Sequence, residues 1–261
     1  MNLKGLKESS KINIEKIEEF VPGKLYYKNN TESTNLDAKL TENVPDKSVF
    51  LADRQTKGRG RMGREWSSPS GVGIWMSIYL KPQTDMADIS KLTLIAGLAV
   101  SRTINGTTIK WPNDVLMGTK KLAGILTEMS AESGKIKNVV VGIGINVNNE
   151  DFPQELQDKA TSLLIETGKQ MEREEIICGV INEFFSMYDK FSYAGFAEFC
   201  DEYTQKCVTL GKEVLIIKNK QKNVAKAIKI TSQGELVVEI NGKEEVINSS
   251  EVSVRGLLGY V

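Results

Sequence analysis

The hydrophobic pattern of the chain changes once, near Gly211. Before this glycine, strand-like apolar runs alternate with stretches of helical periodicity, and after it every run is short and β-like. Gln233-Gly234 and Asn241-Gly242 separate the later runs, as turn dipeptides do between the strands of hairpins. A tail of about 50 residues with four or five short strands predicts a small barrel of SH3-like size.

The part of the chain before Gly211 has the pattern of an α+β domain. Strands are predicted over residues 24–28, 48–55, 73–81, 107–112, 121–131 and 136–148. Helices are predicted within residues 1–23 and over residues 33–42, 86–104, 172–192 and 195–206. Asp88 and either Ser33 or Thr34 are the expected N-caps. The predicted domains are therefore residues 1–209 and 210–261.

Composition excludes several kinds of chemistry. The 261 residues contain no histidine, which rules out Ser-His-Asp and Cys-His catalysis and any zinc site that uses imidazole. Lys+Arg and Asp+Glu both number 34, so no overall charge draws the protein to DNA, RNA or an anionic membrane. Three scattered cysteines indicate reduced thiols. Without a signal peptide or a long apolar run, we expect a cytoplasmic protein with no membrane partner.

The densest group of cations lies in the segment QTKGRGRMGR, residues 55–64. Its glycines have the spacing of a dinucleotide fingerprint, but the following EWSSPSGVG cannot form the helix that this fingerprint opens. Its cations are Lys57, Arg59, Arg61 and Arg64. Because glycine lets the backbone approach a ligand closely, the segment favours phosphate binding over a solvated basic loop or a nucleic-acid contact.

Three further segments carry weaker signals. KWPND (110–114) indicates a tight turn that closes a strand. KLAGIL (121–126) places Lys121 at the mouth of an apolar strand, which suits either a pocket or an ordinary strand edge. GIGIN (142–146) has glycines inside a strand, which mark the close approach of a ligand or backbone, or close packing against a helix.

Together, QTKGRGRMGR, KWPND, KLAGIL and GIGIN, in this order, resemble the biotin–protein ligases. Ser33-Thr34-Asn35 matches the upstream motif of that family, and SSEVSVRG fits its C-terminal barrel, so the resemblance covers about residues 24–261. It implies an α+β catalytic domain around a mixed sheet, biotin/lipoate ligase-like and related to the class II synthetase fold, and then an SH3-like barrel. Since 32 residues precede Ser33, we expect a form without the N-terminal DNA-binding repressor domain of some members.

The resemblance implies an ATP- and Mg²⁺-dependent enzyme that makes biotinoyl-5′-AMP and biotinylates a lysine of a biotin carboxyl carrier protein. The expected catalytic residues are Lys121, Arg59, Arg61 and Asp114. The expected biotin-binding residues are Ser33, Thr34, Asn35, Gln55, Arg59, Gly60, Arg61 and Lys121. The expected nucleotide-binding residues are Arg59, Arg61, Arg64, Lys110 and Asn146. Asp114 either orients the acceptor amine or binds Mg²⁺.

Two alternative functions remain. A lipoate–protein ligase or octanoyl transferase shares the fold, but its sites typically have a different Arg/Gly motif with a histidine close by. A nucleic-acid-binding module is disfavoured by zero net charge and by the absence of aromatic residues from the 57–64 loop. Trp66, Trp75 and Trp111 suit either pocket walls or core positions. The family that this chain resembles includes both monomers and homodimers that pair their sheet edges, so the resemblance allows a homodimer here.

Overall fold

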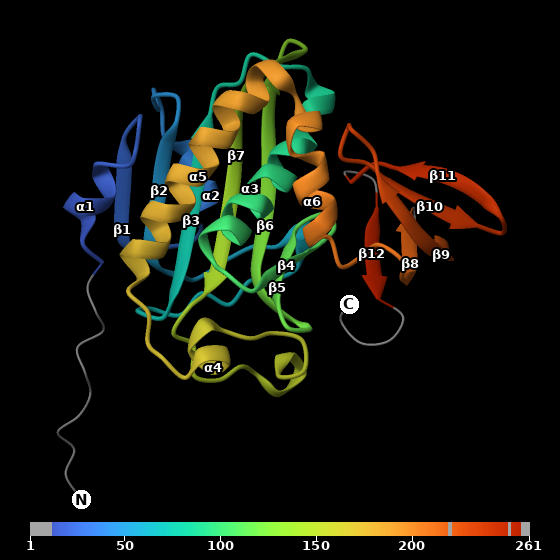
Figure 1. Cartoon of the computed structure of the whole chain (residues 1–261). Coiled ribbons are helices and arrows are strands. Elements are labelled where there is room, and N and C mark those ends of the chain that lie inside the picture. The colour runs from blue at the N-terminus through green and yellow to red at the C-terminus, as the bar shows by residue number, and fades with distance from the viewer. Residues whose placement is uncertain (1–11, 219–220, 250–251, 257–261) are drawn as a thin grey trace, which may run out of the picture.

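A computed structural model describes residues 12–218, 221–249 and 252–256. Within these residues, one sheet has seven strands in the order β1-β2-β3-β7-β6-β5-β4 (Figure 1). Its strands are β1 (Leu25–Thr31), β2 (Ser48–Gln55), β3 (Gly73–Leu80), β4 (Thr107–Lys110), β5 (Asp114–Met117), β6 (Lys120–Glu132) and β7 (Lys135–Asn146). β1 and β2 are parallel and the other neighbours are antiparallel, so the sheet is mixed, as expected.

Helices cover both faces of this sheet. They are α1 (Ile14–Glu18), α2 (Thr34–Leu40), α3 (Ile89–Thr103), α4 (Leu163–Thr167), α5 (Arg173–Ala194) and α6 (Cys200–Lys206), with 3₁₀ turns η1 (Arg61–Gly63), η2 (Met86–Asp88), η3 (Gln154–Leu156) and η4 (Phe196–Phe199). α3 is buried along nearly its whole length and packs with α5 over one face, to which Leu51 and Ile78 contribute. Figure 1 shows this pair in front of the sheet. On the other face, Ala38 of α2 packs against Phe50 and Tyr79.

The chain after α6 forms a second, antiparallel sheet of five strands within the described residues. They are β8 (Glu213–Lys218), β9 (Gln221–Ile230), β10 (Leu236–Ile240), β11 (Lys243–Ile247) and β12 (Ser253–Gly256). Asn241 and Gly242 both have positive φ, as the predicted hairpin turn requires. Trp111 Nε1 donates to the carbonyl of Gly234 at 3.0 Å, and one hydrophobic core includes residues of both sheets. The predicted α+β class with a C-terminal β-domain is confirmed, and the boundary at 209/210 stays a prediction.

The structure adds two elements that the sequence pattern did not predict, β5 and α4. β5 has four residues, too few to show an alternating pattern, and it pairs with β4 across the turn that KWPND predicted. The predicted helix within residues 1–23 corresponds in part to α1, and residues 1–11 lie outside the described part of the chain. Cys178, Cys200 and Cys207 are free thiols. None of the helices in the described segments has the length and apolar character needed to cross a bilayer.

Candidate active site

The candidate site lies on the α2 face of the first sheet, where small residues of three neighbouring strands lie side by side. The register pairs Ser77 of β3 with Gly142 of β7, and Gly144 of β7 with Gly124 of β6. Because successive strand residues point to opposite faces, the same strands still fill the core on the α3 side. The small residues leave a pocket beside α2.

The glycines of β6 and β7 make room for side chains from other segments. A Cβ at Gly142 would lie 2.3 Å from Asn35 Oδ1, and one at Gly144 would lie 2.6 Å from Trp66 Nε1. A Cβ at Gly124 would lie 2.9 Å from Trp66 Cζ3. The close approach expected at these glycines is therefore made by an amide and an indole that line the same pocket.

The predicted uncharged group comes together at this pocket. Gln55 Oε1 accepts hydrogen bonds from the Thr34 amide at 2.9 Å and the Thr34 hydroxyl at 3.1 Å. Gln55 Nε2 donates to Ser68 Oγ at 2.8 Å, and the Ser77 hydroxyl lies 2.7 Å from Thr34 Oγ1. Sequence reasoning missed Ser68 and Ser77. Ser77 lies inside an apolar strand, where an isolated serine gives no signal until its partners are known.

Ser33 stands at the N-cap of α2, as expected, but its side chain makes no capping hydrogen bond. The residue is buried and lines the pocket together with Thr34, Asn35 and Gln55. The α2 amino terminus thus presents a serine hydroxyl to the pocket instead of using it to close the helix.

The Gly/Arg segment folds as a short ribbon and not as a helix start. The Trp66 amide donates to the Gly58 carbonyl at 2.9 Å, and the Gly60 amide donates to the Arg64 carbonyl at 2.7 Å. Only the 3₁₀ turn η1 interrupts it, with Met62 at a φ of 57°. The dinucleotide-binding reading is excluded, as the residues after Gly63 had indicated.

The four cations of this segment have different surroundings. Lys57 pairs with Glu32 at 2.8 Å, away from the pocket, and Arg59 and Arg64 are exposed. Arg61 points inward: it donates to Asn113 Oδ1 at 3.1 Å and to the carbonyls of Ser249 at 2.6 Å and Val252 at 3.1 Å. Burial lowers the pKa of Arg61, and the charge of Asp114 opposes that shift. Arg61 therefore links the loop to residues that lie between β11 and β12.

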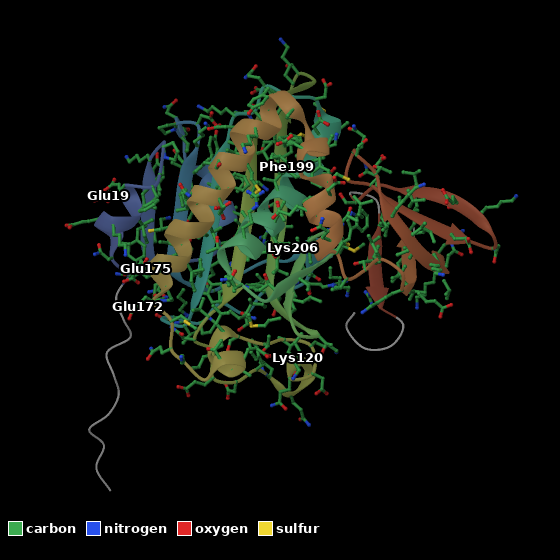
Figure 2. The ribbon with its side chains drawn as sticks, in the orientation of Figure 1. Glu19, Lys120, Glu172, Glu175, Phe199 and Lys206 are labelled. Atoms are coloured by element: carbon green, nitrogen blue, oxygen red, sulfur yellow. The ribbon has the colours of Figure 1, made fainter. Side chains whose placement is uncertain are left out.

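Lys121 lies at the edge of the pocket, where the sequence placed it. Its Nζ is 2.5 Å from Asp114 Oδ1 and 5.0 Å from the centroid of the Trp66 ring. Its backbone is held by a neighbouring loop, since the Lys121 amide donates to the Lys159 carbonyl at 2.8 Å. The adjacent Lys120, labelled in Figure 2, donates to the Gln157 carbonyl at 2.7 Å and does not line the pocket.

Beyond Lys121 the pocket joins a larger cavity of about 470 Å³. The predicted nucleotide residues Arg61, Arg64, Lys110 and Asn146 line it together with Asp114, Lys121 and Arg255; Arg59 lines the smaller pocket instead. Burial is the main cause that lowers the pKa of Lys110 to about 8; the charge of Asp114 opposes the shift, and nearby cations add to it. Asn146 Nδ2 donates to the Thr161 carbonyl at 3.1 Å, which fixes the amide. Arg255, in β12, was not predicted, because nothing in the sequence pattern indicates that β12 reaches this cavity.

The three tryptophans separate into pocket and core residues. Trp66 lines both the pocket and the cavity, and its Nε1 is buried with no hydrogen-bond partner among the described residues. Trp75 lines the pocket from β3, and its Nε1 donates to the Pro69 carbonyl at 3.1 Å. Trp111 also lines the cavity, but it is buried between the two sheets, and its Nε1 donates a hydrogen bond to the Gly234 carbonyl.

The described segments contain no group of three or more Asp, Glu or Cys side chains arranged to hold a metal ion. The carboxylates that line the larger cavity are Asp114 and Glu65. Mg²⁺ in proteins commonly uses one or two carboxylates together with substrate phosphates. The donor set therefore fits a Mg²⁺ that enters with a nucleotide.

Comparison with known proteins agrees with this geometry. The Biotin/lipoate A/B protein ligase family matches residues 25–146, and the Biotin protein ligase C terminal domain matches residues 209–255. A solved biotin protein ligase from Aquifex aeolicus, in complex with biotin and ATP, has a TM-score of 0.81 and 34% identity, and the match covers 89% of this chain and 99% of that one. The matches define the class as a biotin/lipoate-type protein ligase.

Two curated relatives narrow this class. The biotin--[acetyl-CoA-carboxylase] ligase of Paracoccus denitrificans is 30% identical over 237 residues, which cover 87% of this chain and 98% of that protein. The bifunctional ligase/repressor BirA of Bacillus subtilis is 37% identical over 219 residues, 81% of this chain and 67% of the relative. The chain belongs to the biotin protein ligase family.

Proposed function

We propose that the protein joins biotin and ATP to form biotinoyl-5′-AMP and then transfers the biotinoyl group to a lysine of a biotin carboxyl carrier protein. The observation that carries the proposal is that a pocket with uncharged polar side chains and a cavity lined by cations both border on Lys121. On one side, Thr34, Asn35 and Gln55 offer the uncharged donors and acceptors that a neutral ureido ring requires. On the other, a cavity lined by cations fits the phosphates of a nucleotide.

In the first step, a biotin carboxylate oxygen attacks the α-phosphorus of ATP, and the bond to pyrophosphate breaks. An anion meets a polyanion here, and each pair of unit charges about 4 Å apart repels by about 4 kcal/mol at an effective dielectric constant near 20. Lys121 lies where pocket and cavity meet, so its ammonium group is suited to hold both reactants. One of its three N–H donors serves Asp114, which leaves two for ligand oxygens. No histidine base is needed, because the attacking carboxylate is already ionised.

In the second step, the acceptor amine attacks the activated carbonyl and AMP leaves. An ordinary lysine, with a pKa of about 10.4, requires about 4 kcal/mol to lose its proton near pH 7.4. Asp114 lies in the cavity within 2.5 Å of Lys121 Nζ, and we assign it the task of orienting the incoming amine and accepting or relaying its proton. The pair therefore serves both steps.

The alternative role of Asp114 is to hold a Mg²⁺ brought in with ATP. When bound, Mg²⁺ neutralises phosphate oxygens and lowers the charge repulsion of the first step. Arg61 is held at the border of pocket and cavity by the carbonyls of Ser249 and Val252, which lie between β11 and β12, and we assign it to the phosphates. Arg59 and Arg64 are exposed and join the site from the loop.

The proposed protein partner is the biotin carboxyl carrier domain of a carboxylase, in keeping with the name of the Paracoccus relative. The repressor activity named in the Bacillus relative is not part of the proposal, and this chain spans about two thirds of that protein. We further propose a cytoplasmic location. A homodimer that pairs sheet edges is a prediction that sedimentation of the purified protein tests.

Exchange of labelled pyrophosphate into ATP tests the proposed activity. We expect exchange that requires biotin, ATP and Mg²⁺ together, because the pyrophosphate is released only when the adenylate forms. Lipoate and octanoate are the control acids, since both have a carboxylate but no ureido ring. Comparable exchange with either acid would contradict the biotin assignment. A complete lack of exchange with biotin, lipoate and octanoate would contradict adenylation.

A further inference from the structure

The amide of Asn35 is fixed in one orientation. Asn35 Nδ2 donates to Glu128 Oε2 at 2.8 Å and to the Leu126 carbonyl at 3.3 Å. Asn35 Oδ1 lies 2.6 Å from the Ser77 hydroxyl, above the position where Gly142 lacks a side chain. Both N–H groups thus point at β6, and the oxygen lies over a glycine that lines the pocket.

Glu128 is the residue that decides this orientation. A side-chain amide rotated by 180° would place Oδ1, an acceptor, against the Glu128 carboxylate, which is also an acceptor. The repulsion between the two oxygens and the loss of a charge-assisted hydrogen bond both oppose that rotation. Leu126 contributes a backbone carbonyl, which favours the same orientation.

Glu128 itself is held as a carboxylate. Its Oε1 accepts from Lys39 Nζ of α2 at 2.8 Å, and its side chain is 27% exposed. Burial acts to raise the pKa of Glu128, but the hydrogen bonds from Lys39 and Asn35 and the charge of Arg59 outweigh it, so the pKa lies below its ordinary value. Both carboxylate oxygens therefore have a donor, one from each of two α2 residues.

We propose that Glu128 is a positioning residue for biotin specificity: it holds Asn35 Oδ1 toward the pocket as an acceptor for a ureido N–H. An amide oxygen has two lone pairs, and the Ser77 hydroxyl uses at most one of them. The pocket then favours a neutral ring that donates a hydrogen bond at this point. The inference rests on the proposed function and adds a residue that the sequence motifs did not include.

The test measures Kd for biotin and, separately, for ATP. We expect Glu128→Leu to raise Kd for biotin by about 10- to 100-fold, the range for a lost hydrogen bond to a charged group. Kd for ATP should change less than about twofold, since the nucleotide cavity does not include Glu128. Glu128→Gln keeps an oxygen that can accept from Asn35 Nδ2, so it should restore binding to within about threefold of the wild type.

The matched control is Glu132→Leu. Glu132 belongs to the same strand and forms an exposed pair with Lys137 at 3.5 Å, outside the pocket. We expect its Kd for biotin and its thermal midpoint to match the wild type, because exposed pairs contribute little. A rise in Kd in this control equal to that in Glu128→Leu would overturn the proposal.

A second readout separates positioning from general support of the fold. Biotin has two ureido N–H groups, and methylation of the nitrogen that faces Asn35 removes the donor in question, so the wild type should bind this derivative more weakly than biotin. Glu128→Leu should lose most of this discrimination. Without the Glu128 carboxylate, the Asn35 amide can turn either its oxygen or its NH₂ group toward the pocket. Equal weakening of both ligands would indicate damage to the fold and would overturn the positioning role.

Lys39→Met provides the test if Glu128→Leu does not fold. It removes the second donor to Glu128 but leaves the Asn35 hydrogen bond in place. We expect a two- to fivefold rise in Kd for biotin (about 0.4–1 kcal/mol), and an unchanged Kd would overturn the proposal. Wild-type protein that binds no biotin at all would instead contradict the proposed function, so the two failures are distinguishable.

Discussion

At the scale of single residues, we propose that the ion pair between Lys121 and Asp114 serves both half-reactions. Lys121→Met should abolish adenylate formation, because it removes the cation that lies where the pocket meets the nucleotide cavity and offsets the charge of carboxylate and phosphates. One charge-assisted contact made only in the transition state contributes about 3–4 kcal/mol, or about 10²–10³ in rate. Asp114→Asn should mainly slow transfer to the carrier.

Single-turnover assays of each half-reaction separate these outcomes. The first assay follows adenylate formation without a carrier, and the second follows its discharge to the carrier. If Asp114→Asn stops adenylation as completely as Lys121→Met, the essential role of Asp114 is metal binding in the first step and our assignment to the amine is wrong.

Lys110 gives the site a pH dependence. Its pKa is lowered to about 8, mainly by burial, so near this pH a fraction of the free protein has a neutral Lys110. Phosphates favour the charged form and raise this pKa, so ATP binding should take up protons near pH 8. Below about pH 7 Lys110 is already protonated and uptake should vanish.

Calorimetry in two buffers of different ionisation enthalpy measures this uptake directly. Lys110→Met should remove it while leaving ATP binding detectable. Uptake that persists unchanged in Lys110→Met would assign the proton to another group and contradict this account of the cavity.

Several site residues could be predicted from sequence because they lie in motifs that resemble those of the biotin–protein ligases. Thr34, Asn35, Gln55 and Lys121 lie in recognisable motifs, and all of them line the pocket. Ser77 and Glu128 could not be found in this way. Each is a common polar residue on a long strand, and its importance depends on the register that brings it to Asn35.

At the scale of elements, we expect the loop from Lys57 to Arg64 to move when ligand binds. The pocket beneath it has a volume of about 50 Å³, far below the roughly 300–1,000 Å³ of ordinary ligand sites. Trp66 follows the loop, lies against Gly144 and lines the pocket, so we expect this bulky side chain to shift when ligand binds. Closure over the adenylate would then keep water from the mixed anhydride.

Limited trypsin digestion tests this movement. We expect the first cuts after Arg59 and Arg64, which are exposed, and not after Arg61, whose guanidinium is held by two carbonyls. Biotin and ATP together should slow these cuts. An unchanged rate with both ligands present would show that the loop does not close over the site.

The elements that could be predicted are those with a long periodic pattern. The strand expected over residues 48–55 coincides with β2, and the helix over residues 172–192 corresponds to α5. β5 and α4 could not be predicted because four or five residues are too few to show a period of 2 or 3.6. Their positions depend on pairing with β4 and β6 and on the loop before α5.

At the scale of the whole molecule, the two sheets are expected to unfold together. Gly234, in the turn before β10, has a φ of 76°, and a Cβ there would lie 2.4 Å from Leu94 Cδ1 of α3. Gly234→Ala should therefore destabilise the protein through both the positive φ and the clash with Leu94. We expect it to cost about 1–3 kcal/mol more than an alanine at a positive φ without such a clash. Calorimetry should show one transition at a lower temperature.

Gly242→Ala is the matched control for this prediction. Gly242 has the same φ of 76°, but open space surrounds the position of its Cβ, so this variant isolates the backbone penalty. Equal destabilisation by the two alanines, or a separate early transition of the C-terminal sheet in Gly234→Ala, would contradict the view that this turn joins the sheets.

The most direct test of the proposed activity is to trap the adenylate. The purified protein is mixed with biotin, Mg²⁺ and ATP labelled in the α-phosphate, without a carrier, and the bound product is identified by mass spectrometry. We predict one biotinoyl-AMP per active site, which a carboxyl carrier domain then discharges as biotinyl-lysine and free AMP. Label that remains in ATP, or an adenylate that forms equally well with lipoate, would contradict the account.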